Sequence, residues 1–206
     1  RRLRESLGLP ETGVWPEGVA PHVAIVGAGL IGSELANDLA LGGHHITLLD
    51  TATEPLARWH DQQAGPQLLD AWKDLSIRFE GGLQVQQVER VGSRYRVSTT
   101  SGRRFAADEV VVAAGLLPPH RLAQSAGLDW THGIAVDAGT LQTSVSRIHA
   151  LGDCISIDGQ CSRYIEPIAR QARTLAAAIL GQPVAPYEHR AAVVRVKTTT
   201  RPLTLH

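Results

Sequence analysis

Apolar positions in the first half of the chain alternate between short continuous runs and stripes of helical spacing. The runs predict buried strands at His22–Val26, in the segment that ends before Asp50, at Ile77–Phe79 and at Val110–Ala114. A stripe of apolar side chains predicts a helix over Gln67–Asp74. Strands that alternate with helices are typical of an α/β fold with a parallel sheet.

The helix between the first two strands has an expected apolar face. That face comprises Ile31, Leu35 and Leu39, supported by Ala36 and Ala40. Gly42 and Gly43 follow, and they predict the end of the helix.

Three further runs before Val110 have the alternation of half-exposed strands. They are Leu83–Val91, Tyr95–Thr100 and Arg103–Phe105. Turn-forming pairs, Gly92-Ser93 and Ser101-Gly102, separate them, so we expect a β-meander inserted into the α/β domain.

The second half of the chain begins at the break formed by Pro118 and Pro119. Short runs follow at Ile134–Val136, Thr140–Thr143 and Ile148–Ala150. A helix is predicted over Glu166–Leu180, with an apolar stripe of Ile168, Ala172, Leu175, Ala176 and Ile179. The last predicted strands are Val193–Lys197 and Leu203–Leu205.

The first strand, its helix and the second strand carry a complete dinucleotide motif. Gly27, Gly29 and Gly32 form GxGxxG: the first permits a tight turn, the second lets a pyrophosphate approach the backbone, and the third lets helix and strand pack closely. The first helical residues, Leu30 and Ile31, direct free N–H groups at the phosphates. The plain alternative is a strand–helix–strand unit that holds no nucleotide.

The acid that closes the second strand bears on which cofactor binds. Asp50 is placed to accept hydrogen bonds from the adenosine ribose and to repel the extra phosphate of NADP, which favours NAD. Gly115 follows the last strand and is also predicted to bind the cofactor. We therefore expect residues 22–117 to form a Rossmann-like NAD-binding domain with the meander inserted.

Composition narrows the possible partners. The 206 residues carry 20 basic and 20 acidic side chains, so the formal net charge is zero, which argues against nucleic acid or an anionic membrane as partner. Five arginines crowd the meander, and a solvated hairpin surface is favoured for them over a docking patch. These are Arg90, Arg94, Arg96, Arg103 and Arg104. No run has the length of a transmembrane helix.

Cysteine and histidine usage predicts no metal site. Cys154 and Cys161 are spaced unlike a CxxC or zinc motif, and two reduced thiols in the cytosol are favoured over a redox pair. The chain has no methionine and begins at Arg1, so we expect it to be a piece of a longer protein.

Three motifs in one order carry a family resemblance. They are GAGLIGSELANDL at 27–39, VVVAAGLLPP at 110–119 and TSVSRIHALGDC at 143–154. Together they resemble FAD-dependent pyridine nucleotide-disulfide oxidoreductases, and most closely the NADH:rubredoxin reductases, including the flavorubredoxin-linked kind. The late segments IEPIARQARTLAAAILG and VVRVKTTTRPL are similar to the same group.

The resemblance implies a cytoplasmic enzyme with two dinucleotide cofactors, FAD and NAD. Hydride would pass from NADH to the flavin, and electrons would then pass to a small iron protein such as rubredoxin. Glu34 would lie beside the nicotinamide, and Asp153, after Gly152, would bind the flavin's ribityl hydroxyls. Pro167 and Ile168, at a helix start, would face the flavin pyrimidine. Plain alternatives are an exposed helix acid for Glu34 and a turn cap for Asp153.

The resemblance also implies a division of the chain. Residues 1–21 are expected to be a lead-in linker, 22–117 the NAD domain, 118–182 the later part of an FAD domain, and 183–206 the start of an interface domain. Leu117 stands where the family usually has arginine. Only one GxGxxG is present, so we expect this piece of the protein not to include the N-terminal FAD half of the family.

Two other functions compete with the reductase. A non-catalytic NAD(H)-binding module or subunit would need no flavin of its own, which the single glycine motif favours for the isolated chain. A flavin-free short-chain dehydrogenase needs lysine four residues after tyrosine, and Tyr95, Tyr164 and Tyr187 all lack it.

Overall fold

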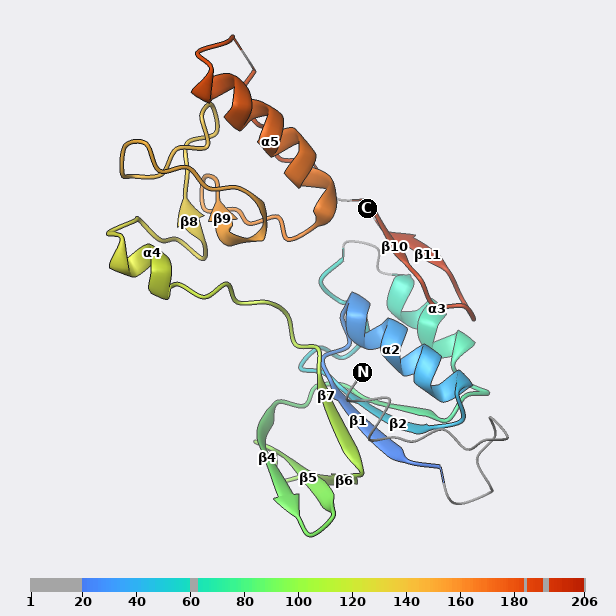
Figure 1. The fold of residues 1–206 in the computed structure, drawn as a ribbon. Helices are drawn as coiled ribbons and strands as arrows, with labels where there is room; N and C mark the ends of the chain where they lie inside the picture. The colour runs from blue at the N-terminus through green and yellow to red at the C-terminus, as the bar shows by residue number, and fades with distance from the viewer. Residues whose placement is uncertain (1–19, 60–62, 184, 191–192, 206) are drawn as a thin grey trace, which may run out of the picture. The chain divides into compact units, whose positions relative to one another are not determined.

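The computed structural model describes residues 20–59, 63–183, 185–190 and 193–205. The predicted linker 1–21 therefore lies almost wholly outside the described residues. Two compact units are present (Figure 1): the described residues up to Gly115 together with those from Val193 onward, and the described residues from Leu116 to Arg190. The predicted domain boundaries stay a prediction.

A four-stranded parallel sheet forms the centre of the first unit. Its strand order is β3 (Ile77–Glu80), β2 (His45–Leu49), β1 (His22–Val26) and β7 (Glu109–Val112). Strands β2 and β3 lie on one side of β1, and β7 pairs with the other side of β1. The direction in which successive strands are added to the sheet therefore reverses at β1. In such sheets ligands bind beyond the carboxyl ends of the strands at the point of reversal. The expected α/β fold is confirmed.

Each face of the sheet is covered by a different part of the chain. Helices α2 (Leu30–Leu41) and α3 (Ala64–Ala71) cover one face, where Ile25 and Leu48 are fully buried among their side chains. On the other face, Ala24 and Leu49 pack against the meander. Because both faces are buried at the centre of the sheet, β1 and β2 are nearly continuous apolar runs, whereas the edge strand β3 alternates apolar and charged residues.

The buried face of α2 differs from the predicted one. Ile31 is 58% exposed, and the buried residues are small or polar: Gly32, Ser33, Ala36, Asn37 and Ala40. Leu35 and Leu39 are only partly buried. The expectation that Ile31 faces the core is wrong, because the helix approaches the sheet closely through residues too small to register as an apolar stripe.

The meander forms as expected, with slightly shifted ends. It consists of β4 (Val85–Val91), β5 (Arg94–Thr99) and β6 (Arg104–Ala107), all antiparallel.

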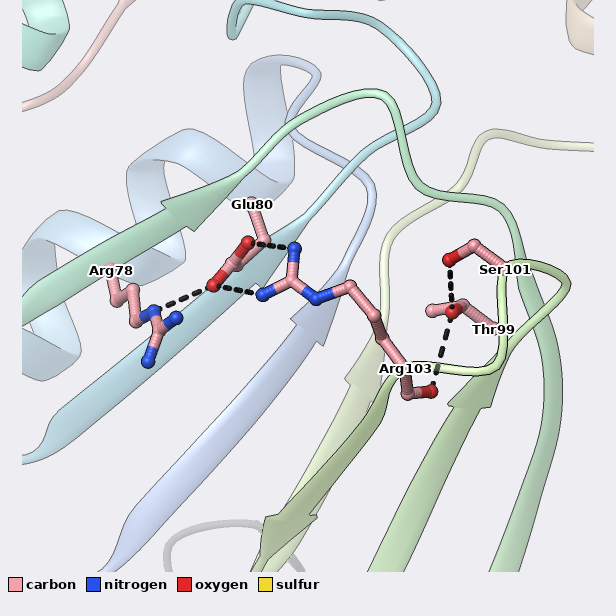
Figure 2. A network of polar contacts seen from close by, with 5 residues as sticks. All are labelled: Arg78, Glu80, Thr99, Ser101 and Arg103. Atoms are coloured by element: carbon pink, nitrogen blue, oxygen red, sulfur yellow. Dashed lines mark hydrogen bonds and ion pairs between the residues drawn. The ribbon is translucent and has the colours of Figure 1, made fainter.

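A polar network joins the meander to the parallel sheet (Figure 2). The carboxylate of Glu80, at the end of β3, accepts two short contacts from the Arg103 guanidinium, at 2.9 and 2.7 Å, and one from Arg78 at 2.6 Å. Thr99 Oγ1 in turn donates to the Arg103 carbonyl at 3.2 Å. Arg94 and Arg96 are also ion-paired, with Asp108 and Glu89. These pairings favour the solvated-hairpin interpretation of the arginines.

The hairpin of β10 (Val194–Val196) and β11 (Leu203–Leu205) belongs to the first unit. Val196 and Leu205 are at most 1% exposed and lie in the same core cluster as the residues of α2 and α3.

The second unit contains little regular structure. Its elements are α4 (Arg121–Ser125), β8 (Ile134–Ala135), the 3₁₀ turn η1 (Gly152–Cys154), β9 (Ile155–Ser156) and α5 (Ile165–Ile179). A small core forms around Leu141, Ile155 and Ile157. The runs at 140–143 and 148–150 form only isolated bridges.

Helix α5 corrects the predicted stripe. Ile179 is 64% exposed, whereas Pro167, Gln171 and Thr174 are buried at positions four and three apart. The helical period is therefore present, but polar side chains occupy part of the buried face.

Candidate dinucleotide site

Two of the three motif glycines are required by the fold itself. Gly27 has φ +103°, and a Cβ there would lie 2.5 Å from the Ala113 carbonyl oxygen at the end of β7. A Cβ on Gly32 would lie 1.8 Å from the Gly27 carbonyl oxygen. The turn after β1 is thus packed tightly between β7 and the first turn of α2, which fixes the helix N-terminus at the edge of the sheet.

Gly29 is different, because nothing in the described protein requires a glycine there. Its φ is −73°, and no atom lies within 4 Å of an added Cβ. Every other glycine in the described ranges has a positive φ or a neighbour closer than 3.5 Å to an added Cβ. A side chain at Gly29 would therefore enter open space at the start of α2.

The N-terminus of α2 faces this space with its N–H groups uncapped. Gly29 is the N-cap and offers no side-chain hydrogen bond, and the first turn holds no acid. Leu30 and Ile31 supply the first N–H groups, and the Ser33 N–H is the first to bond within the helix, to the Gly29 carbonyl at 2.9 Å. Uncapped N–H groups at a helix start attract an anion, since the helix dipole also favours negative charge there.

Asp50 lies beside the same turn. One carboxylate oxygen accepts the Ala28 N–H at 2.5 Å, and the other accepts the Ala52 N–H at 2.8 Å. The carboxylate therefore joins the ends of β1 and β2 and remains partly exposed at the sheet edge. A carboxylate has about four acceptor positions, so lone pairs remain for ribose hydroxyls.

Gly115 follows β7 at the same sheet edge. Ala113, just before it, donates its N–H to the Val26 carbonyl at 2.7 Å, which brings the end of β7 against the glycine turn. Gly115 itself has φ +104° and is exposed. The structure thus gathers the predicted NAD residues of the first unit at one edge of the sheet.

Glu34 lies one turn further along α2 and is partly buried. Its Oε1 accepts the backbone N–H of Lys197, in the segment after β10, at 2.8 Å. Sequence reasoning did not anticipate this partner, because the two residues are 163 positions apart.

The predicted flavin residues of the second unit form a separate group around η1 and the start of α5. Gly152, with φ +84°, donates its N–H to Oε1 of the buried Gln171 at 2.8 Å. Ile168 lies 4.0 Å from the position of a Gly152 Cβ, Pro167 is buried, and Asp153 is exposed. The turn is therefore held by α5 while it presents the Asp153 side chain to solvent.

Two ionisable groups near this turn have shifted pKa values. Hydrogen bonds from Arg170 hold the pKa of Glu166 below the usual glutamate value. Burial raises the pKa of the Cys154 thiol, which disfavours the thiolate form.

Asn37 and Gln171 are residues that sequence reasoning missed. Both are buried polar side chains in helices, at 0% and 1% exposure. The only sign of them in the sequence is an amide side chain at a helical position where a buried residue is expected. The residues that form hydrogen bonds with these amides lie far away in the sequence.

Two surface clefts among the described residues lie away from the predicted site. The larger one, of about 570 Å³, lies in the second unit and is lined in part by His120, Trp130, His132 and Arg163. Within the described ranges, no three His, Cys, Asp or Glu side chains are grouped to hold a metal ion. None of the helices in the described part of the chain is long and apolar enough to cross a membrane.

Relatives of known function match most of this chain. The nitric oxide reductase FlRd-NAD(+) reductase of Salmonella arizonae is 39% identical over 186 residues, which are 90% of this chain and 49% of that protein. The protein of the same name from Aliivibrio fischeri is 40% identical over 183 residues, covering 89% and 48%. The chain therefore spans about half the length of the curated relatives it matches.

Solved structures and a family match agree with these relatives. A ferredoxin reductase from Rhodopseudomonas palustris has a TM-score of 0.74 at 30% identity, covering 82% of this chain and 43% of that chain. Putidaredoxin reductase, in its covalent complex with putidaredoxin, also has a TM-score of 0.74, at 28% identity over 86% and 44%. Residues 8–178 match the pyridine nucleotide-disulphide oxidoreductase family, which confirms the resemblance, and the chain belongs to that family.

Proposed function

We propose that this chain is the NAD(H)-binding part, and the later flavin-binding part, of an FAD-dependent NADH oxidoreductase that reduces a small iron protein such as rubredoxin. FAD, when bound, would accept hydride from NADH and release electrons singly. The residues of the chain bind and orient the two cofactors, and hydride transfer needs no side-chain nucleophile or base.

The observation that carries this proposal is the open space at Gly29. Neither the backbone conformation nor the packing of the described residues requires a glycine at this position. The space lies at the uncapped start of α2, beyond the strand where the sheet order reverses. A pyrophosphate fits both features, because it needs close backbone approach and N–H donors. Asp50, at the end of the next strand, would accept the ribose hydroxyls of NADH.

FAD would be held, on this chain, by the group around η1. The exposed Asp153 carboxylate is an acceptor suited to ribityl hydroxyls. N–H groups at a helix start stabilise the negative charge that a reduced flavin acquires. Ile168 supplies such an N–H, whereas Pro167 has none and would contact the flavin only through its ring. An acceptor at Asp153 and N–H donors at the start of α5 are the polar groups that a flavin would need here.

The iron-protein acceptor is supported by the names of relatives. The curated relatives are reductases of FlRd, and one structural relative was solved bound to putidaredoxin. For this chain, a rubredoxin-type or iron–sulfur partner is the corresponding proposal.

The NAD site is tested by titrating NADH into the 206-residue chain and following the fluorescence of the bound nucleotide. Gly29→Val should abolish binding and leave the circular dichroism spectrum unchanged, because the added side chain enters open space. Thr204→Val, at an exposed position of β11, serves as the control and should bind NADH normally. Normal affinity in Gly29→Val would overturn the pyrophosphate assignment.

The flavin part is tested by the visible absorption spectrum of the chain after addition of FAD and then NADH. A bound flavin spectrum that bleaches with NADH would assign the reductase activity to this chain itself. NADH binding without retained flavin would instead favour the alternative, a NAD(H)-binding module that does not hold FAD by itself.

A further inference from the structure

The segment between β10 and β11 is joined to α2 by hydrogen bonds at two neighbouring positions of the helix. We call Lys197–Arg201 the strap. Glu34 Oε1 accepts the Lys197 N–H at 2.8 Å. One turn away, Asn37 Nδ2 donates to Thr199 Oγ1 at 3.1 Å, and Thr200 Oγ1 donates to Asn37 Oδ1 at 2.5 Å. Glu34 and Asn37 are three residues apart, so they share one face of the helix.

Asn37 is suited to hold the strap in one position. It is fully buried, and both ends of its amide are bonded to the strap. Asparagine is unfavourable within a helix, and a buried amide without partners is destabilising. Two threonine hydroxyls on adjacent residues satisfy it, and rotation of the amide would break both bonds.

The strap is also anchored from outside α2. Val196 and Leu205, in the strands on either side, are buried in the core of the first unit. The Arg201 guanidinium donates to Gln67 Oε1 on α3, at 2.8 and 3.2 Å. The Lys197 N–H therefore has a fixed position relative to α2.

We propose that Asn37 is a positioning residue for Glu34. By fixing the strap, Asn37 directs the Lys197 N–H at the Glu34 carboxylate and holds that carboxylate in one rotamer. This inference rests on the proposed function and on the role that the family resemblance implies for Glu34, beside the nicotinamide. A carboxylate that accepts one N–H still has lone pairs for a ligand, so the strap orients Glu34 without consuming it. The hairpin thereby becomes part of the nicotinamide end of the site.

The test compares two ligands that share every group except the nicotinamide end. NADH and ADP-ribose both offer the pyrophosphate and the adenosine ribose to the glycine turn and Asp50, but ADP-ribose has no nicotinamide. Asn37→Ala should weaken NADH about fivefold, the equivalent of about one hydrogen bond, and leave ADP-ribose within about twofold. Affinities are measured by titration calorimetry of the 206-residue chain.

A second variant leaves α2 untouched. Thr199→Val combined with Thr200→Val removes the two hydroxyls and keeps the side-chain shape. It should reproduce the effect of Asn37→Ala, and the two changes together should weaken NADH no further, because they remove the same contact. Hydrogen exchange of the Lys197 amide, followed by nuclear magnetic resonance, should accelerate about tenfold in either variant, while the β1 amides stay unchanged.

The outcomes separate this inference from the proposed function. Failure of the wild-type chain to bind NADH would overturn the proposed function and, with it, the nicotinamide role of the strap. If NADH binds but the Lys197 amide is unprotected in the wild type, the inference alone is overturned. Equal losses of NADH and ADP-ribose affinity would likewise overturn it, since they would mean that Asn37 only maintains the fold.

Discussion

The Asp50 carboxylate lies 2.5 Å from the backbone nitrogen of Ala28, so the acid that ends β2 holds the glycine turn that follows β1. The same carboxylate accepts the Ala52 N–H and thereby orders the start of the loop after β2. One side chain thus combines a structural task with the ribose-binding role we propose for it. A substitution at Asp50 is therefore expected to change both the stability of the fold and the affinity for the nucleotide.

Asp50→Arg should raise the ratio of NADPH affinity to NADH affinity about tenfold or more, because a repulsive charge is replaced by a phosphate partner. The free energy of unfolding should fall by about 1–3 kcal/mol, since the Ala28 and Ala52 N–H groups lose their acceptor. Fluorescence titrations with both nucleotides and urea unfolding measure the two effects separately. Asp50→Asn, which keeps one acceptor oxygen, is the control. An unchanged nucleotide ratio in Asp50→Arg would remove Asp50 from the ribose site.

The glycine motif should divide into structural and ligand-binding positions. Gly32→Ala should lower the free energy of unfolding by about 3 kcal/mol, because its Cβ would overlap the Gly27 carbonyl oxygen. Gly29→Ser should change it by no more than about 0.5 kcal/mol, since its side chain enters open space and serine is a good N-cap. Urea unfolding followed by circular dichroism distinguishes them. Wild-type stability in Gly32→Ala would contradict the packing described here.

Sequence pattern predicted the strands of the parallel sheet and the glycine turn because these features are local. Continuous apolar runs and a fixed glycine spacing are visible within a few residues. The buried face of α2 was predicted wrongly, because Gly32 and Ala36 pack against the sheet through their small size and leave Ile31 exposed. The spacing of apolar residues predicts which helix positions are hydrophobic, whereas the close contact between α2 and the sheet requires small side chains.

The buried polar residues could not be predicted from the local sequence, because their hydrogen-bond partners are distant along the chain. Asn37 is explained by Thr199 and Thr200, more than 160 positions later, and Gln171 by Gly152 on another element. No periodicity within a helix reveals such a partner. Resemblance to a family carried the Asp153 assignment for the same reason: from the sequence alone, a turn cap is the favoured interpretation of this acid, and only the order of the three motifs reverses it.

The Glu80 network should make part of the stability depend on pH. Hydrogen bonds from Arg103 hold the pKa of Glu80 below the usual glutamate value, although burial opposes the shift. A carboxyl whose pKa is lower in the folded state contributes stability above its unfolded pKa and loses it as the pH falls through the folded pKa. The contribution is therefore present at pH 7 and declines below about pH 5.

Glu80→Gln measures this contribution. At pH 7 the variant should be less stable by about 1–2 kcal/mol, a value kept small because Arg103 and Arg78 are 44% and 70% exposed. Urea unfolding of both proteins between pH 7 and pH 3 should show the difference shrinking toward acid pH. A difference that is constant with pH would mean that the ion pairs contribute nothing and that only packing was changed.

Gln171 should be essential to the turn that presents Asp153. Its side-chain oxygen is the acceptor for the Gly152 N–H, and both groups are buried, so Gln171→Met leaves that N–H without a partner while keeping the length and helix propensity of the side chain. The free energy of unfolding should fall by about 1–3 kcal/mol, and the Gly152 amide should exchange faster with solvent. Arg173→Met, at an exposed position of α5, is the matched control and should alter neither quantity by a comparable amount. Equal effects of the two methionine variants would show that α5 tolerates the loss of the buried amide, and the Gly152 turn would then be held by its own backbone conformation rather than by Gln171.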